Sequence, residues 1–200
     1  MEESLSFLSE KYQLEGLIDK NSTDTGVVIT HPHPLYGGDM NNFIVDLIAR
    51  TYQKKDFTTL RFNFRGTGKS QGSYADGVGE QEDVCSALST LQQLGIKSIN
   101  LAGYSFGAWV NALAIDKSPF VENMIMVSPP VGFVDFGSVN SISSLKLVVT
   151  GSMDDIAPAD RIKTMTPGWN PKAQLKIITG ADHFYSGCLD ELESVLSSNI

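Results

Sequence analysis

The sequence has few residues of the kinds that build disulfide frameworks and metal sites. It contains two cysteines, Cys85 and Cys188, which lie far apart and belong to no Cys-x-x-Cys pair. Two cysteines make no disulfide framework, and a zinc site needs more ligands at closer spacing. Only three histidines are present, His31, His33 and His183. We therefore expect no disulfide, no metal ion and no cofactor.

Long apolar segments and an excess of positive charge are also missing. No apolar run approaches the roughly 20 residues that cross a bilayer, and the first residues, MEESLSFLSEKYQ, lack the basic start of a signal peptide. Lys and Arg number 15 against 23 Asp and Glu, a net charge of −8. An acidic surface repels polyanions, so we expect neither nucleic acid nor a membrane as a partner. The expectation is a soluble cytoplasmic protein, a monomer or a homodimer.

What is present is an ordinary globular composition with alternating strand and helix patterns. With 42% hydrophobic residues, the 200 residues suit a single domain over 1–200. From residue 26 onward strands and helices alternate, which predicts an α/β fold with a mostly parallel sheet and helices on both faces. The two N-terminal strands are expected to form an antiparallel edge. The expected strands are 12–18, 26–30, 58–64, 98–103, 123–128, 145–151 and 175–179, and the expected helices are 41–54, 78–94, 105–115, 160–165 and 189–196.

The segment NFRGTGKSQG, residues 63–72, resembles part of a phosphate-binding loop. A full loop of that kind is Gly, four residues, then Gly-Lys-Ser or Gly-Lys-Thr, and it opens directly into a helix. Here the first position is Asn63, and QGSYADGVG follows Ser70, which is a poor helix start. The sequence therefore favours a glycine-rich turn over a nucleotide site.

The segment LAGYSFGAWVNALA, residues 101–114, carries a more specific motif. Gly103-Tyr104-Ser105-Phe106-Gly107 matches G-x-S-x-G between an apolar strand and a small-residue helix, which is the context that this motif requires. The chain must turn sharply at the serine, and side chains two residues away on either side would collide there. Ser105 is thus a candidate nucleophile. The helix amides, first that of Phe106, are candidate oxyanion donors.

A serine nucleophile needs a base, and the base needs a carboxylate that orients it. In the expected order Ser, Asp, His, each residue follows a later strand. Asp154 and Asp155 come just after the strand 145–151, and His183 comes just after the strand 175–179. His183 is the only histidine beyond residue 33, so it has no rival as the base. From the residues alone, either aspartate could be the acid.

With these motifs the chain resembles the α/β-hydrolase superfamily, and within it the small group without a lid that is related to dienelactone hydrolases and carboxylesterases. The resemblance implies that the acid lies in Gly-x-x-Asp-x-x-Val-Pro, which selects Asp154 over Asp155, although Ala157 replaces the valine. It also implies an RGxGxSxG turn, which accounts for the glycine-rich segment. Dienelactone hydrolases themselves use cysteine, so the serine here argues against dienelactone as the substrate. The matching segments are THPHPLYGGDMNN, LRFNFRGTGKSQG, GYSFG, GSMDDIAP and GADHF.

A second oxyanion donor should come from the loop HPHPLYGGD, residues 31–39. Proline has no amide hydrogen, and the resemblance points to the backbone amide of Leu35, with Tyr36 as the alternative. His31 and His33 are better explained as residues that shape this loop than as metal ligands, because no third histidine is near. Only PPVGFVDFGSVNSIS lies between the strands 123–128 and 145–151, which is too short for a helical cap.

The sequence thus predicts a serine hydrolase that cleaves a small carboxylic ester or thioester through Ser105, His183 and Asp154 and an acyl-enzyme intermediate. Two alternatives stay open. One is a hydrolase-fold binding protein whose site is catalytically idle, and the other is a peptidase of the same fold.

Overall fold

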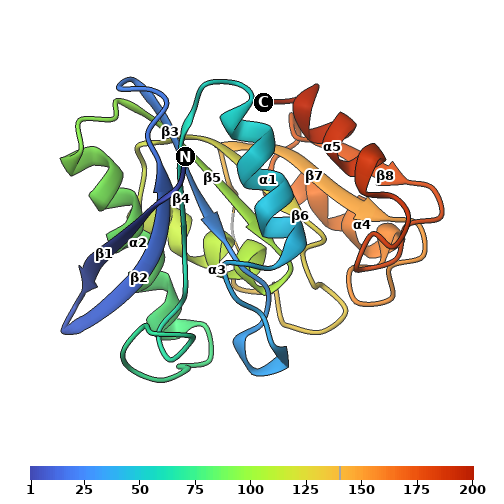
Figure 1. Cartoon of the computed structure of the whole chain (residues 1–200). Coiled ribbons are helices and arrows are strands. Elements are labelled where there is room, and N and C mark those ends of the chain that lie inside the picture. The colour runs from blue at the N-terminus through green and yellow to red at the C-terminus, as the bar shows by residue number, and fades with distance from the viewer. Residues whose placement is uncertain (140) are drawn as a thin grey trace.

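A computed structural model describes residues 1–139 and 141–200 of the chain. One sheet has the strand order β1-β2-β4-β3-β5-β6-β7-β8 (Figure 1). Neighbours from β4 through β8 pair in parallel, and β2 is antiparallel to both β1 and β4. The expected α/β fold with a mostly parallel sheet is confirmed. The strands are β1 (Glu3–Ser9), β2 (Tyr12–Asp19), β3 (Thr25–Thr30), β4 (Thr58–Phe62), β5 (Ser98–Tyr104), β6 (Val121–Val127), β7 (Leu145–Gly151) and β8 (Gln174–Ile178).

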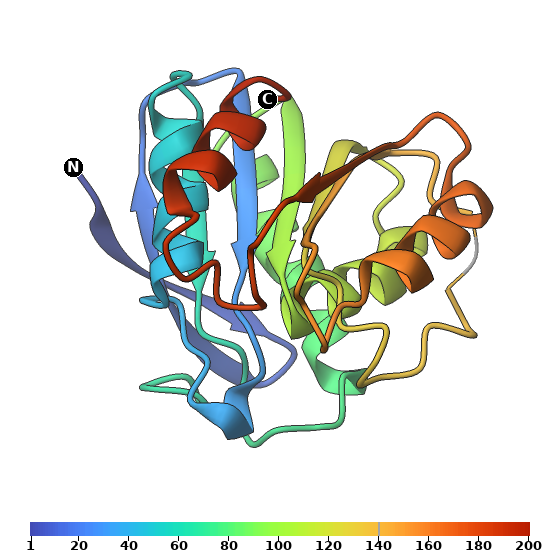
Figure 2. The same ribbon diagram turned by 90° about the vertical axis from the view of Figure 1, so that its right-hand side faces the viewer.

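Helices cover both faces of the sheet, as expected. α1 and α5 lie on one face, and α2, α3 and α4 lie on the other (Figures 1 and 2). Each layer has its own hydrophobic core, because the sheet separates them. No helix of the described chain is long and apolar enough to span a bilayer. The helices are α1 (Phe43–Gln53), α2 (Val78–Gln93), α3 (Phe106–Ala114), α4 (Ala159–Trp169) and α5 (Leu189–Ser197), with short 3-10 helices at Pro34–Tyr36 and Ile115–Lys117.

The antiparallel edge differs from the prediction. It consists of β1, which the sequence analysis missed, and β2, whereas β3 lies inside the sheet and pairs in parallel with β4 and β5. The central apolar run of β3, Val27 to Ile29, explains its position, since a strand covered on both faces has no polar side to alternate.

The helix predicted over 160–165 is longer, and it runs as α4 from Ala159 to Trp169. Pro167 lies in its last turn, where the missing amide hydrogen leaves one helix bond unmade. Trp169 is buried beneath the helix end, and its ring packs against Phe136 with centroids 5.3 Å apart. This packing carries the helix past the proline.

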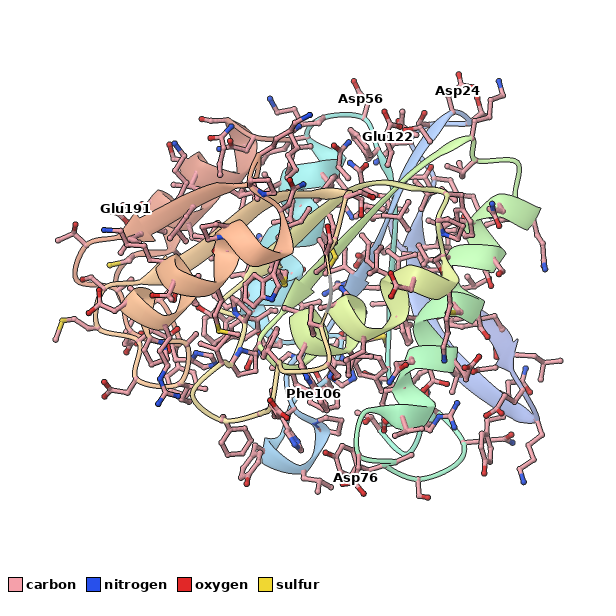
Figure 3. All side chains as sticks on the ribbon, turned by 180° about the vertical axis from the view of Figure 1, so that it is seen from behind. Asp24, Asp56, Asp76, Phe106, Glu122 and Glu191 are labelled. Carbon is pink, nitrogen blue, oxygen red and sulfur yellow. The ribbon has the colours of Figure 1, made fainter. Side chains whose placement is uncertain are left out.

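The carboxyl ends of the parallel strands share one rim of the sheet, opposite the rim that carries Asp24, Asp56 and Glu122 (Figure 3). β3 and β5 are neighbours at the point where the strand order reverses, and Thr30 pairs with Gly103 there. Ligands of such sheets bind at this reversal point. Between β6 and β7, the described residues 128–139 and 141–144 contain no helix, so no helical cap is seen over this rim. Residue 140 of the predicted cap-less loop lies outside the described residues.

Candidate active site

Ser105 lies in the sharp turn between β5 and α3. Its backbone has φ 53° and ψ −120°, a conformation that a residue with a side chain rarely adopts. The turn needs glycine on both sides. A Cβ at Gly103 would lie 2.7 Å from the Ala108 amide nitrogen, and one at Gly107 would lie 2.7 Å from the Thr30 carbonyl oxygen. The predicted reason for both glycines therefore matches the geometry.

The structure brings together the three side chains that the motifs selected. Nε2 of His183 lies 2.9 Å from Oγ of Ser105, and Nδ1 lies 2.9 Å from each carboxylate oxygen of Asp154. All three residues are buried. A carboxylate only accepts, so Nδ1 carries the hydrogen and Nε2 is free to accept the serine hydroxyl. This is the tautomer that a general base for Ser105 requires.

Asp154 is held by more than the histidine. Its Oδ1 accepts the amide hydrogens of Ile156 (3.0 Å) and Ala157 (2.7 Å). Burial alone would raise the pKa of Asp154, but its hydrogen bonds, above all that from His183, bring that pKa below its ordinary value. The carboxylate is therefore charged at neutral pH. Asp155, the alternative acid, points into solvent.

Two buried hydroxyls support this arrangement, and the sequence analysis missed both. Ser128, the residue after β6, has φ 46°, and its hydroxyl lies 2.8 Å from Tyr185 Oη. Ser128 also contributes to the lowered pKa of Asp154. Tyr104 donates its phenol hydrogen to the His183 carbonyl oxygen at 2.8 Å. Tyr104 and Tyr185 stand next to motif residues, but nothing in their spacing shows that their hydroxyls turn toward the site.

His31 fastens the loop after β3 from inside the protein. It is fully buried, its Nδ1 lies 2.7 Å from the Pro32 carbonyl oxygen, and its Nε2 accepts the Phe64 amide hydrogen at 3.0 Å. Burial lowers the pKa of His31 from 6.5 to about 4, so the ring is neutral at pH 7. The described residues contain no cluster of three potential metal ligands. These bonds match the predicted loop-shaping role.

His33 joins two loops at the same rim. Its Nδ1 accepts the Leu35 amide hydrogen at 3.2 Å, and its Nε2 lies 3.2 Å from Tyr74 Oη in the glycine-rich segment. Partial burial lowers the pKa of His33. Since Nδ1 accepts, the neutral ring donates from Nε2 to the tyrosine oxygen.

The two proposed oxyanion donors occupy different surroundings. Phe106 follows Ser105 directly and begins α3, so its amide has no acceptor within the helix. The Leu35 amide is bound to His33, and the Leu35 side chain is exposed. The Tyr36 amide donates to the His33 carbonyl oxygen at 3.1 Å. A role for Leu35 as donor stays a prediction, and it requires the bond to His33 to open.

The glycine-rich segment after β4 is a turn without the helix of a phosphate-binding loop. α2 begins only at Val78, and Gly66 and Gly68 have φ of 75° and 57°. Ser70 Oγ bonds the Asn63 carbonyl oxygen at 2.7 Å, which closes the turn on itself. The geometry thus favours the turn over the nucleotide site.

A cavity of about 280 Å³ opens beside Ser105 and His183. Its other walls come from the loops after β3, β6, β7 and β8, and they include Tyr36, Phe133 and Phe184. Leu35 is not part of this lining; it borders a separate hollow beside Gly66 and Gly68. The cavity therefore has room for a small substrate group directly at the serine hydroxyl.

Comparison with known proteins places this geometry among hydrolases. Residues 33–144 match the family of the alpha/beta hydrolase fold. An uncharacterised protein of Rickettsia prowazekii is 33% identical over 197 residues, which cover 92% of this chain and 83% of that protein.

Two solved structures are similar over nearly their full length. An alpha-beta serine hydrolase homologue from Coxiella burnetii has a TM-score of 0.90 and 37% identity, and the match covers 99% of this chain and 97% of that one. A serine hydrolase without a lid from Xanthomonas campestris also has a TM-score of 0.90, with 27% identity, and the match covers 99% and 93% of the two chains.

Proposed function

Since this chain belongs to the α/β-hydrolase family, we propose that it is a serine hydrolase that cleaves a carboxylic ester or thioester. The observation that carries the proposal is the continuous hydrogen-bonded line from Ser105 Oγ through the His183 ring to Asp154. The positions of these groups support the proposal, because acyl transfer needs a base within hydrogen-bond reach of the serine and a carboxylate that orients that base.

In the first half of the reaction, Ser105 Oγ attacks the acyl carbon while His183 Nε2 takes the hydroxyl proton. The tetrahedral intermediate carries its negative charge on the former carbonyl oxygen, which the Phe106 amide stabilises. Collapse breaks the bond to the alcohol or thiol, and His183 returns the proton to that leaving group. Asp154 keeps the imidazole in its tautomer and stabilises the imidazolium.

In the second half, water attacks the acyl-serine and His183 takes a proton from that water. Collapse releases the carboxylic acid and restores the Ser105 hydroxyl. The described residues between β6 and β7, 128–139 and 141–144, form no helix, which supports a small substrate that reaches the serine without the movement of a helical lid.

The test compares the protein with Ser105→Ala and with a matched serine variant, Ser89→Ala on α2. We expect the protein to hydrolyse p-nitrophenyl acetate and a short thioester and to be labelled by a fluorophosphonate. Ser105→Ala is expected to lose about 10³-fold or more in kcat and all labelling, while Ser89→Ala keeps both.

Three results would contradict the proposal. Equal rates for Ser105→Ala would remove the serine from the mechanism. A folded protein that neither labels nor hydrolyses any ester would be a binding protein instead. Preferential cleavage of peptide amides over matched esters would make the chain a peptidase.

A further inference from the structure

The lining of the cavity beside Ser105 includes a ring wall made of Tyr36, Phe133 and Phe184. Tyr36 follows β3, Phe133 follows β6 and Phe184 follows β8, so three separate loops each contribute one ring to a single lining. Tyr36 and Phe133 meet edge to face with centroids 5.7 Å apart, and Phe184 meets the His183 ring in the same way at 5.7 Å. The rings thus form two groups, one of which includes the proposed base.

These rings are exposed in the free protein. The exposed fractions are 74% for Tyr36 and 55% each for Phe133 and Phe184. Exposed aromatic side chains that converge on one hollow are typical of a binding site, because covering them removes apolar surface from water. Aromatic side chains also interact with a further aromatic ring edge to face or in an offset stack, and a puckered aliphatic ring cannot make these contacts. The occupant that suits this wall is therefore apolar and planar.

The charges around the cavity restrict the occupant further. The residues that line it include no Lys, Arg, Asp or Glu. Asn42 contributes the side-chain amide of the lining, and this amide is uncharged; its Oδ1 accepts the Ile44 amide hydrogen at 2.9 Å as the cap of α1. A carboxylate on the acyl group would lose water there without gaining a cation, and an ammonium would gain no carboxylate.

We infer that the acyl group taken by this site is an uncharged aryl group with a single ring. This inference rests on the proposed function and specifies its substrate. The volume of about 280 Å³ lies at the lower end of the range for small-molecule pockets, which favours a small acyl group such as one with a single ring. The site accepts a benzoate-type ester and rejects the same ester with a charge at the far end of the ring.

The experiment holds the leaving group constant by using methyl esters and following methanol release. Each kcat/KM is divided by the alkaline hydrolysis rate of the same ester, which removes differences in intrinsic reactivity. The set is methyl 4-methylbenzoate, its saturated analogue methyl 4-methylcyclohexanecarboxylate, and benzoates with 4-carboxylate or 4-trimethylammonium in place of the methyl group. We expect the neutral aryl ester to exceed each of the others at least fivefold.

Two phenylalanine variants connect that preference to the ring wall. Phe133→Leu keeps an apolar side chain but removes the ring, and we expect it to lower the ratio of aryl to saturated rates at least threefold. Phe120→Leu changes a partly exposed phenylalanine outside the cavity and is expected to leave the ratio as it is.

The outcomes separate the inference from the proposed function. Turnover that depends on Ser105, but with equal rates for the flat and puckered rings or a preference for a charged ester, overturns the inference alone. An unchanged ratio in Phe133→Leu also overturns it. Absence of ester turnover together with absence of fluorophosphonate labelling overturns both.

Discussion

Arg65 and Asp83 form an ion pair that is buried on both sides. Arg65 Nη2 lies 2.8 Å from Asp83 Oδ1, with side-chain exposures of 6% and 0%. The same carboxylate accepts the Arg65 backbone amide hydrogen at 3.0 Å. Arg65 begins the glycine-rich turn and Asp83 lies on α2, so the pair fastens the turn to that helix.

Asp83→Asn is expected to lower the free energy of unfolding by about 3 kcal/mol, because it removes the buried counter-charge of a buried guanidinium and leaves only the exposed one. Glu10→Gln is the matched control. Glu10 lies 3.2 Å from the same guanidinium but is 55% exposed, and an exposed pair contributes about 0–1 kcal/mol. Urea denaturation measures both values. Equal losses in the two variants would show that burial does not set the strength of this pair.

The two adjacent aspartates after β7 provide a test of the acid. Asp154→Asn is expected to lower kcat on p-nitrophenyl acetate by roughly 10³–10⁴-fold, because the histidine is no longer held in the right tautomer. Asp155→Asn changes an exposed side chain and should leave kcat within about twofold, as ordinary surface substitutions do. The opposite pattern would transfer the role to Asp155.

Gly107→Ala tests the turn that carries the serine. Its Cβ would lie 2.7 Å from the Thr30 carbonyl oxygen, so we expect a loss of about 1–3 kcal/mol in unfolding free energy and a fall in esterase activity. Gly168→Ala is the control, since Gly168 belongs to α4 and a Cβ there would meet nothing within 4 Å beyond the chain neighbours and the helix's own backbone. Alanine there should stabilise the protein by about 0.5–1 kcal/mol. Thermal melts and ester assays on both variants decide the point, and an active, stable Gly107→Ala protein would contradict it.

His31 makes stability depend on pH. Its pKa is about 4 in the folded protein against 6.5 otherwise, because burial disfavours the charged ring. Between about pH 4 and pH 6.5, the unfolded chain therefore carries a proton on His31 that the folded protein does not carry. The full contribution of His31 is present above pH 6.5, declines as pH falls, and is lost below about pH 4. At pH 5 the expected loss is about 2 kcal/mol relative to pH 7.5.

Urea denaturation at pH 7.5, 6 and 5 measures this slope. His31→Gln should be less stable at pH 7.5 and should lose most of the dependence between pH 6.5 and 5. His33→Gln removes a less buried imidazole and should keep most of it. The same slope in His31→Gln as in the unchanged protein would assign the effect to other groups.

The site motifs could be predicted because each is local. The G-x-S-x-G motif by itself predicts a sharp turn between a strand and a helix. Asp154 and His183 each follow an apolar strand closely, so the parallel sheet brings them to the rim that carries Ser105. The link between Ser128 and Tyr185 could not be predicted, since it spans 57 residues and depends on how two side chains turn. Local sequence patterns therefore identify the residues at the rim of the sheet, but they do not identify the long-range hydrogen bonds that support those residues.

The fold errors have a similar origin. β1 was missed although Leu5 and Phe7 alternate with serines, because most of that short strand is exposed and its pattern is weak. β3 was expected to be part of an antiparallel edge, although its central apolar run, Val27 to Ile29, indicates an interior strand. The predicted helix 160–165 stops before Pro167, whereas α4 continues through the proline to the buried Trp169. In the last case, tertiary packing outweighed a local signal.

The bond between the Tyr104 phenol and the His183 carbonyl oxygen ties the strand that leads into Ser105 to the loop that carries its partner. Hydroxyl and imidazole are therefore preorganised before any ligand arrives. In the proposed hydrolase, folding itself therefore orders the hydroxyl and the imidazole, and substrate binding does not have to order the loop that carries His183.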